Sequence, residues 1–319
     1  MLDFALKTSG TLLSPPGERA KLSILIYHRV LRQPDELFPL EVDAARFEAQ
    51  MLAVRKLFHV LPLSEAVFRL KDGCLPARSA CITFDDGYAD NVEVAFPILQ
   101  RLQIPATFFV ADGFLDGGIM FNDRIMEMIR NIRIPLLDLT SLGMDRLPLT
   151  SLEQKRAAIA YLLSRLKYAS LEKREEWLIE IERIAGTVPA AHLMMRSQQV
   201  RELFDAGMEI GGHTVNHPIL ASIDMASSES EILRNKERLE KITNHPVKLF
   251  AYPNGKPQTD YNAEHVALIE KLGFDAAVST RPGVSYRHSD YFQLPRFTPW
   301  DLSPTRFSLR LLNNLRKPC

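Results

Sequence analysis

The stretch Ser-Ala-Cys-Ile-Thr-Phe-Asp-Asp-Gly at residues 79–87 places two adjacent carboxylates directly after a short apolar run. The run is rich in strand-forming residues and ends at a turn signal, which predicts a buried strand over 79–84. In parallel α/β folds ligands bind at the C-terminal ends of the strands, because the connecting loops converge there. Asp85 and Asp86 need not share a role if Gly87 permits a turn that re-aims one of them. Turn formation alone is the simpler interpretation of Asp-Asp-Gly.

A second motif, Gly-Gly-His-Thr-Val-Asn-His-Pro at residues 211–218, supplies two imidazoles four residues apart. Residues 208–210 predict a short strand, and the two glycines after it indicate a close backbone approach or a sharp turn. If the following residues form one helical turn, His213 and His217 share a face. Imidazoles suit zinc and similar divalent ions, and a carboxylate completes a three-ligand site with room for water.

Together the two motifs resemble those of the polysaccharide deacetylases, the NodB-homology group of carbohydrate esterases. Residues 83–87 look like the first motif of that family, and residues 213–217 match its second motif, His-Ser/Thr-x-x-His. The resemblance extends from about Ser23 to Thr298 and implies a distorted (β/α) barrel, usually with seven strands. It also implies that Asp85 is the general base. The metal ligands that it implies are Asp86, His213 and His217, with zinc as the favoured ion.

The third motif of the family normally carries an Arg before its groove segment, and this chain departs from that pattern. The matching stretch is Leu-Phe-Ala-Tyr-Pro-Asn-Gly at residues 249–255, which resembles a Phe-Ala-Tyr-Pro-x-Gly variant of members associated with bacterial cell-surface polysaccharides. Tyr252, Pro253 and Asn254 are therefore expected to contribute to substrate binding. The backbone near Tyr252 either donates to an oxyanion or only shapes the groove.

The late Leu-x-His motif that carries the general acid in the family is not visible in this chain. Residues 293–299 read Gln-Leu-Pro-Arg-Phe-Thr-Pro instead. Arg296 is either a surface residue or pairs with Asp85 and fixes its orientation, as an Arg from another motif does in better-known members. His28 follows a strand predicted over residues 22–27 and is expected near the site mouth. It protonates the leaving amine, binds substrate or is structural, and we favour the first role.

Composition narrows the class of protein. The 319 residues are 46% apolar, which is ample for a buried core. Equal numbers of basic and acidic residues, 39 each, argue against a nucleic-acid or anionic-membrane partner and are compatible with a glycan substrate. Cys74, Cys81 and Cys319 form no Cys-x-x-Cys pair. Neither a secretory signal nor a transmembrane segment is evident, so the cytoplasm is the expected compartment. The oligomeric state is left open.

Strand-like and helical segments alternate along the chain, which predicts a parallel α/β barrel formed by a single domain over residues 1–319. Residues 114–196 interrupt this alternation, because they are rich in Leu, Arg, Lys and Glu and are mainly helical in pattern. This stretch is too long for a barrel loop. It is predicted to be a helical insertion over the site mouth, acting through packing alone or as a lid or substrate-length selector.

These observations predict a metal-dependent hydrolase that removes N-acetyl groups from an amino sugar of a bacterial surface polysaccharide or its precursor. One alternative is a hydrolase of a non-glycan amide, because relatives of this fold hydrolyse small cyclic amides. A second is a glycan-binding pseudoenzyme with a structural metal, because the usual general acid and Arg are missing. Asp85 argues against the pseudoenzyme, since binding alone needs no base.

Overall fold

The computed structural model describes residues 2–187 and 192–317, so Cys319 lies outside the described residues. Its centre is a seven-stranded parallel sheet with the order β1-β3-β4-β7-β8-β9, and β2 pairs with the start of β3. The strands are β1 (Leu22–Tyr27), β2 (His59–Val60), β3 (Ser79–Phe84), β4 (Thr107–Val110), β7 (Glu209–Gly212), β8 (Leu249–Ala251) and β9 (Ala276–Val278).

The central strands are buried along their whole length, which explains their sequences. Every residue of β1, β3 and β4 is buried, so these strands are almost continuously apolar rather than alternating. The bounds of β1 and β3 are those predicted from the sequence. The strand predicted at residues 208–210 instead runs to Gly212, so the histidine motif begins directly at its end.

The sheet is curled, and a C-terminal segment connects its two outer strands. Leu294 forms a parallel bridge with Val278 of β9, and Phe297 forms one with Leu25 of β1. The curled parallel sheet confirms the predicted distorted α/β barrel. Arg296 lies in this connecting segment, between two residues that bridge opposite edges of the sheet.

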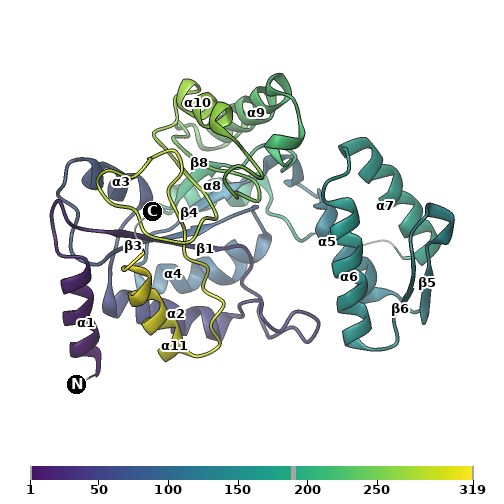
Figure 1. Cartoon of the computed structure of the whole chain (residues 1–319), viewed down its shortest axis with the longest axis horizontal. Coiled ribbons are helices and arrows are strands. Elements are labelled where there is room, and N and C mark those ends of the chain that lie inside the picture. Colours follow the sequence, from purple (N-terminus) through teal and green to yellow (C-terminus); the bar gives the residue numbers. More distant parts are fainter. Residues whose placement is uncertain (1, 188–191, 318–319) are drawn as a thin grey trace.

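Helices cover the two sides of the barrel (Figure 1). The helices α2 (Ala44–Leu57), α4 (Phe96–Leu102) and α11 (Pro304–Asn314) lie on one side, and α9 (Met225–Thr243) and α10 (Ala263–Lys271) lie on the other. Helix α1 (Leu2–Leu13) forms the N-terminal end. A π-helical turn, Asn91–Ala95, precedes α4, and Pro97 stands in the first turn of α4, where its missing N–H is tolerated. The helices of the barrel are α1 (Leu2–Leu13), α2 (Ala44–Leu57), α3 (Leu63–Lys71), α4 (Phe96–Leu102), α8 (Ser197–Asp205), α9 (Met225–Thr243), α10 (Ala263–Lys271) and α11 (Pro304–Asn314).

A separate lobe interrupts the barrel between β4 and β7 (Figure 1). It has its own cluster of buried apolar side chains, which includes Ile125, Leu162 and Ile181. The sequence did not predict its antiparallel hairpin, because strands of three residues are too short to show an alternating pattern. The lobe contains α5 (Phe121–Asn131), β5 (Leu136–Asp138), β6 (Arg146–Pro148), α6 (Leu152–Leu166) and α7 (Leu171–Ala185).

The lobe is attached to the loop that follows β1. Leu37 of this loop belongs to the apolar cluster of the lobe. Asp35 forms an ion pair with Arg130 of α5 at 2.5 Å, and Arg156 of α6 donates to the Leu37 carbonyl at 2.9 Å. These contacts hold the lobe beside the C-terminal ends of the strands.

Among the residues that the structure describes, no helix combines the length and the apolar character needed to cross a bilayer.

Candidate active site

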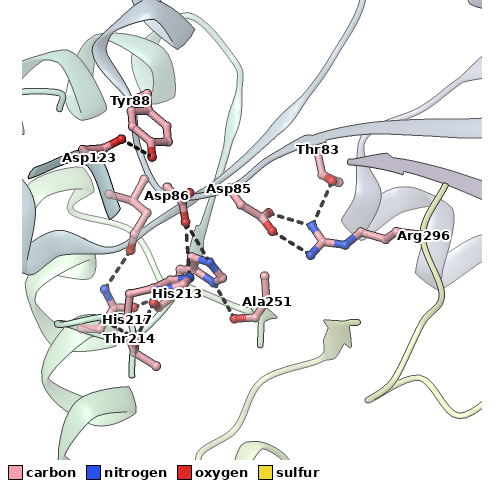
Figure 2. A network of polar contacts seen from close by, with 12 residues as sticks. Thr83, Asp85, Asp86, Tyr88, Asp123, His213, Thr214, His217, Ala251 and Arg296 are labelled. Carbon is pink, nitrogen blue, oxygen red and sulfur yellow. Dashed lines mark hydrogen bonds and ion pairs between the residues drawn. The ribbon is translucent and has the colours of Figure 1, made fainter. Parts of the chain in front are cut away.

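The two adjacent carboxylates after β3 point in different directions because of a tight turn. The Gly87 N–H donates to the Asp85 carbonyl at 3.0 Å, and Asp86 between them has a φ of +76°. Such a three-residue turn with positive φ is rare and strained. Figure 2 shows the result: Asp85 points toward Arg296, and Asp86 points toward the two histidines.

The strained turn is held from two sides. The Ala111 N–H at the end of β4 donates to the Asp86 carbonyl at 3.2 Å. On the other side, the Met195 N–H donates to the Gly87 carbonyl at 2.9 Å. Strained backbone persists where its surroundings over-determine it, and such positions cluster at functional sites. The last residues of the predicted insertion, Leu193–Arg196, thus pack against the site rather than within the lobe.

Residues 213–217 do not form the helical turn that would place His213 and His217 on one face. These residues form an irregular loop in which Thr214 and His217 have φ values of +63° and +51°. The Thr214 hydroxyl accepts the His217 N–H at 3.1 Å, so a side chain closes the loop in place of a helical hydrogen bond. The two imidazoles still meet, with ring centroids of His213 and His217 4.8 Å apart.

The two glycines before the histidines allow a close approach that other residues would block. A Cβ atom on Gly211 would lie 2.4 Å from the Phe109 ring, and one on Gly212 would lie 2.9 Å from the Asn235 side-chain oxygen. The predicted close backbone approach is therefore present, and it places His213 against α9.

Asp86, His213 and His217 form a cluster suited to a metal ion. Their potential ligand atoms all lie within 4.8 Å of one another, and each Nε2 lies 3.3–3.4 Å from Asp86 Oδ1. His213 Nδ1 lies 2.7 Å from the Ala251 carbonyl, which assigns the proton to Nδ1 and leaves Nε2 as a ligand. Within the described residues, Asp86 Oδ1 is buried and accepts no hydrogen bond, although both imidazoles face it. A buried carboxylate oxygen without a donor is costly, so a divalent cation fits this set of donors.

The pKa values of the cluster are consistent with metal binding. Burial opposes ionisation of Asp86, but His213 and His217 outweigh it and hold the pKa of the carboxyl well below its usual range. Burial lowers the pKa of His217 to about 4, which keeps this ring neutral at pH 7. Burial also disfavours the charged form of His213, but Asp86 and Asp85 raise the pKa of this ring. A cation bound here therefore competes with protons for the same ligand atoms, and its affinity decreases as the pH is lowered.

Two residues of α9 support the histidine loop, and the sequence did not identify them. Glu231 accepts hydrogen bonds from the N–H groups of Val215 and Asn216 at 3.0 and 2.7 Å. Asn235, which is fully buried, accepts the His213 N–H at 3.0 Å. In the sequence, polar residues four apart on a helix are typical of a solvent-exposed face. The one available signal of another role was an Asn in the middle of the helix, where Asn is unfavourable.

Asp85 forms a buried ion pair with Arg296. Two guanidinium nitrogens each lie 2.7 Å from one carboxylate oxygen, and Arg296 Nε donates to the Ser279 carbonyl at 2.9 Å. Burial opposes ionisation of Asp85, but Arg296 and then His213 outweigh it and lower the pKa of this carboxyl. The surface interpretation of Arg296 is therefore wrong, since the side chain is buried. Its role in orienting the base stays a prediction.

Tyr252 is part of the barrel packing. Its ring stacks on Tyr261 with centroids 3.7 Å apart, and its hydroxyl donates to the Phe292 carbonyl at 3.0 Å. The Tyr252 N–H donates to the Val278 carbonyl at 3.3 Å, and a proline such as Pro253 has no N–H to offer. These contacts favour the groove-shaping interpretation of Tyr252 over the oxyanion role.

Asn254 lies at the metal cluster. It lines a pocket of about 210 Å³ together with Asp86 and His217. Its φ is +57°, and its N–H donates to no acceptor within the described residues. Of the three expected substrate-binding residues, Asn254 is the one that lines this pocket.

His28 lies beyond the end of β1 and is exposed. Its carbonyl accepts a hydrogen bond from the Asn91 side chain at 2.8 Å, which fixes the backbone. Its charge contributes to lowering the pKa values of both Asp85 and Asp86, although it is not the largest cause for either. His28 is therefore placed on the same side of the barrel as the cluster, and its role stays a prediction.

Asp123 of α5 is a buried acid that the sequence did not identify. Its Oδ1 accepts a hydrogen bond from the Tyr88 hydroxyl at 3.3 Å, beside the Asp86 turn (Figure 2). Its Oδ2 has no hydrogen-bond partner among the residues that the structure describes. Burial raises the pKa of Asp123 to about 7, with Arg29 opposing and Asp86 adding to the shift.

The raised pKa predicts how Asp123 affects stability. An acid whose pKa is higher in the folded state stabilises the protein at low pH, and this contribution is lost as pH rises from about 4 to about 7. In chelator-treated protein, the wild type should therefore lose this contribution between pH 5 and pH 8, whereas Asp123→Asn has no such contribution to lose. The free energy of unfolding of Asp123→Asn minus that of the wild type should rise by a few kcal/mol over this range. Urea unfolding at the two pH values measures this. Glu127→Gln on the same helix is the control, and an equal gain in both variants would contradict the assignment.

Comparison with known proteins agrees with the geometry. The model of the polysaccharide deacetylase family matches residues 72–161 and 172–277, which is more than half of the chain. The chain therefore belongs to the polysaccharide deacetylase family, as its two motifs predicted.

Three relatives illustrate the similarity. YxkH of Bacillus subtilis (strain 168) is 22% identical over 279 residues, which are 87% of this chain and 71% of YxkH. The poly-beta-1,6-N-acetyl-D-glucosamine N-deacetylase of Staphylococcus aureus (strain NCTC 8325) is 35% identical over 79 residues, which are 24% of this chain and 27% of that enzyme. The Streptococcus pyogenes deacetylase PplD, solved in complex with acetate, shares the fold with a TM-score of 0.61 and 22% identity, over 92% of this chain and 98% of PplD.

Proposed function

We propose that this polysaccharide deacetylase is metal-dependent and removes N-acetyl groups from an amino sugar of a bacterial surface polysaccharide or its precursor. The observation that carries the proposal is the buried Oδ1 of Asp86, which accepts no hydrogen bond from the described residues and faces two imidazoles. Asp86 follows directly after Asp85, which is ion-paired with Arg296. The Staphylococcus aureus relative, whose name gives poly-beta-1,6-N-acetyl-D-glucosamine as its substrate, supports the substrate class.

Asp86, His213 and His217 would hold the ion, with zinc as the favoured identity. Bound there, a divalent cation polarises an acetyl carbonyl and lowers the pKa of water. Asp85 accepts the proton of the attacking water, because its oxygens keep a lone pair each after Arg296 has donated to both. Arg296 keeps Asp85 ionised and in one orientation.

We assign the oxyanion contact to the backbone of Asn254. Its N–H is free within the described residues and it belongs to the pocket, whereas the Tyr252 N–H already has an acceptor. A preorganised N–H donor stabilises the negative charge that develops on the acetyl oxygen.

The proton for the leaving amine is assigned to His28, whose charge acts on Asp85 and Asp86. An amide anion leaves far less readily than an alkoxide, so His28→Ala should lower turnover on acetamides by about 10²-fold or more and on acetate esters much less. Steady-state kinetics on matched amide and ester substrates measures the difference. The control is His288→Ala, an exposed His of a C-terminal loop. Equal losses on both substrates indicate positioning instead, and no loss on either indicates a structural role.

The experiment that tests the proposed function is acetate release from a panel of N-acetylated oligosaccharides, nucleotide sugars and small cyclic amides. Release from amino-sugar substrates supports the proposal. Turnover of cyclic amides alone indicates the non-glycan hydrolase. Glycan binding without any release indicates a pseudoenzyme.

A further inference from the structure

The pocket at the metal cluster carries two cationic side chains that the proposed chemistry does not use. Lys167, at the end of α6, and Arg174, in α7, line it together with Asp86 and His217. Asp86, a proposed metal ligand, is the one acid among the lining residues. Apart from the proposed metal ligands, the charge on the wall of this pocket is therefore positive.

Arg174 is buried without an anionic partner. It is 9% exposed, and its guanidinium lies 4.3 Å from the centroid of the Phe121 ring. Within the described residues its side chain has no hydrogen-bond acceptor and no ion pair, because the adjacent Glu175 pairs with Arg124 at 2.6 Å. Contact with an aromatic face compensates only part of the cost of burying a cation. Because Arg174 lines the pocket, its unpaired donors are available to a ligand there.

Arg174 also stands where two pockets adjoin. A second pocket of about 330 Å³ shares Phe121 and Arg174 with the first, and Asn216 of the histidine loop lines it. A glycan with its target sugar over the metal cluster would pass Arg174 if it extended into the second pocket.

We propose that Arg174, assisted by Lys167, binds an anionic group, a carboxylate or a phosphate, on the part of the substrate next to the deacetylated sugar. This inference rests on the proposed function, because the metal cluster defines where the acetamide lies. A planar guanidinium matches both anions with two parallel hydrogen bonds. The insertion then selects acidic or phosphate-bearing glycans over neutral ones.

The test measures binding to the zinc-loaded protein by calorimetry. The probes are a neutral N-acetylglucosamine tetrasaccharide, a hyaluronan tetrasaccharide as the carboxylate and N-acetylglucosamine 1-phosphate as the phosphate. Arg174→Gln should weaken binding of the preferred anionic probe by about 10- to 100-fold, the effect of one hydrogen bond to a charged group, and change the neutral probe less than about twofold. The affinity of Arg174→Lys for the anionic probe should lie between those of the wild type and Arg174→Gln, because Lys keeps the charge but cannot form two parallel hydrogen bonds. A loss with one anionic probe alone identifies which anion is recognised.

Two controls separate recognition from folding. Arg183→Gln removes an exposed Arg of the same helix, which pairs with Glu180, and should bind all probes as the wild type does. Lys167→Gln, at a half-buried position, should weaken anion binding several-fold and leave the thermal unfolding midpoint unchanged, which keeps the test valid if Arg174→Gln unfolds.

Three outcomes overturn the inference. Anionic and neutral probes that bind the wild type equally are the first, and an Arg174→Gln loss that is equal for both probes is the second. Anion binding that survives Arg174→Gln and Lys167→Gln, as direct capture by the metal would, also overturns it. Because this test reads the affinity for each probe and not acetate release, its result can be distinguished from a failure of deacetylation. Arg174-dependent anion binding without acetate release contradicts the proposed function and leaves the anion site intact.

Discussion

Asp85→Asn should retain the metal ion and lose turnover by a factor of about 10² to 10⁴. The amide is nearly isosteric with the carboxylate but cannot accept the proton of the attacking water. Asp85 is not part of the metal cluster, because the turn at Asp86 directs the two side chains apart. Acetate release, with metal content measured on the same sample, gives both quantities.

The variant needs a control for folding, because Arg296 is buried. Removing one partner of a buried ion pair leaves a charge uncompensated and costs about 3–5 kcal/mol of stability. The double variant Asp85→Asn/Arg296→Gln removes that charge and should recover part of the stability while staying inactive. Recovery of activity together with stability would show that Asp85 is structural. Loss of the metal from Asp85→Asn with normal metal content in Asp86→Asn would show that the two roles are exchanged.

His213→Ala and His217→Ala should each lower metal affinity by more than about 100-fold. Changing even the hydrogen-bond partners of metal ligands costs about 10- to 100-fold, and loss of one ligand of three costs more. Metal analysis after dialysis against a known free zinc concentration measures the loss. His245→Ala removes an exposed imidazole that does not belong to the cluster and should keep one ion per chain. Unchanged metal content in both histidine variants would contradict the assignment of His213 and His217 as metal ligands.

The strands and the three residues of the cluster could be predicted because their signals are local. Continuous apolar runs bounded by turn residues marked β1 and β3 with their observed ends. Asp86 and the two histidines followed from the two motifs. The same local reasoning failed for the histidine loop, where a helical period was assumed and the Thr214 hydroxyl closes the loop instead.

Residues contributed by helices far away in the sequence could not be predicted. Glu231 and Arg174 belong to charged helices, where such residues are usually solvated. Asp123 acquires its raised pKa from burial beside Tyr88, which depends on how the lobe packs against the barrel. Sequence periodicity indicates which residues form a helix, but not which of its polar residues the tertiary fold buries at a site.

The most direct test of the account is zinc titration of the metal-free protein, with acetate release from an N-acetylated glycan and bound zinc measured together. We expect no release from the chelator-treated protein, and a return of activity that rises with bound zinc and stops at about one ion per chain. Full acetate release from protein shown to contain no divalent ion would contradict the central claim.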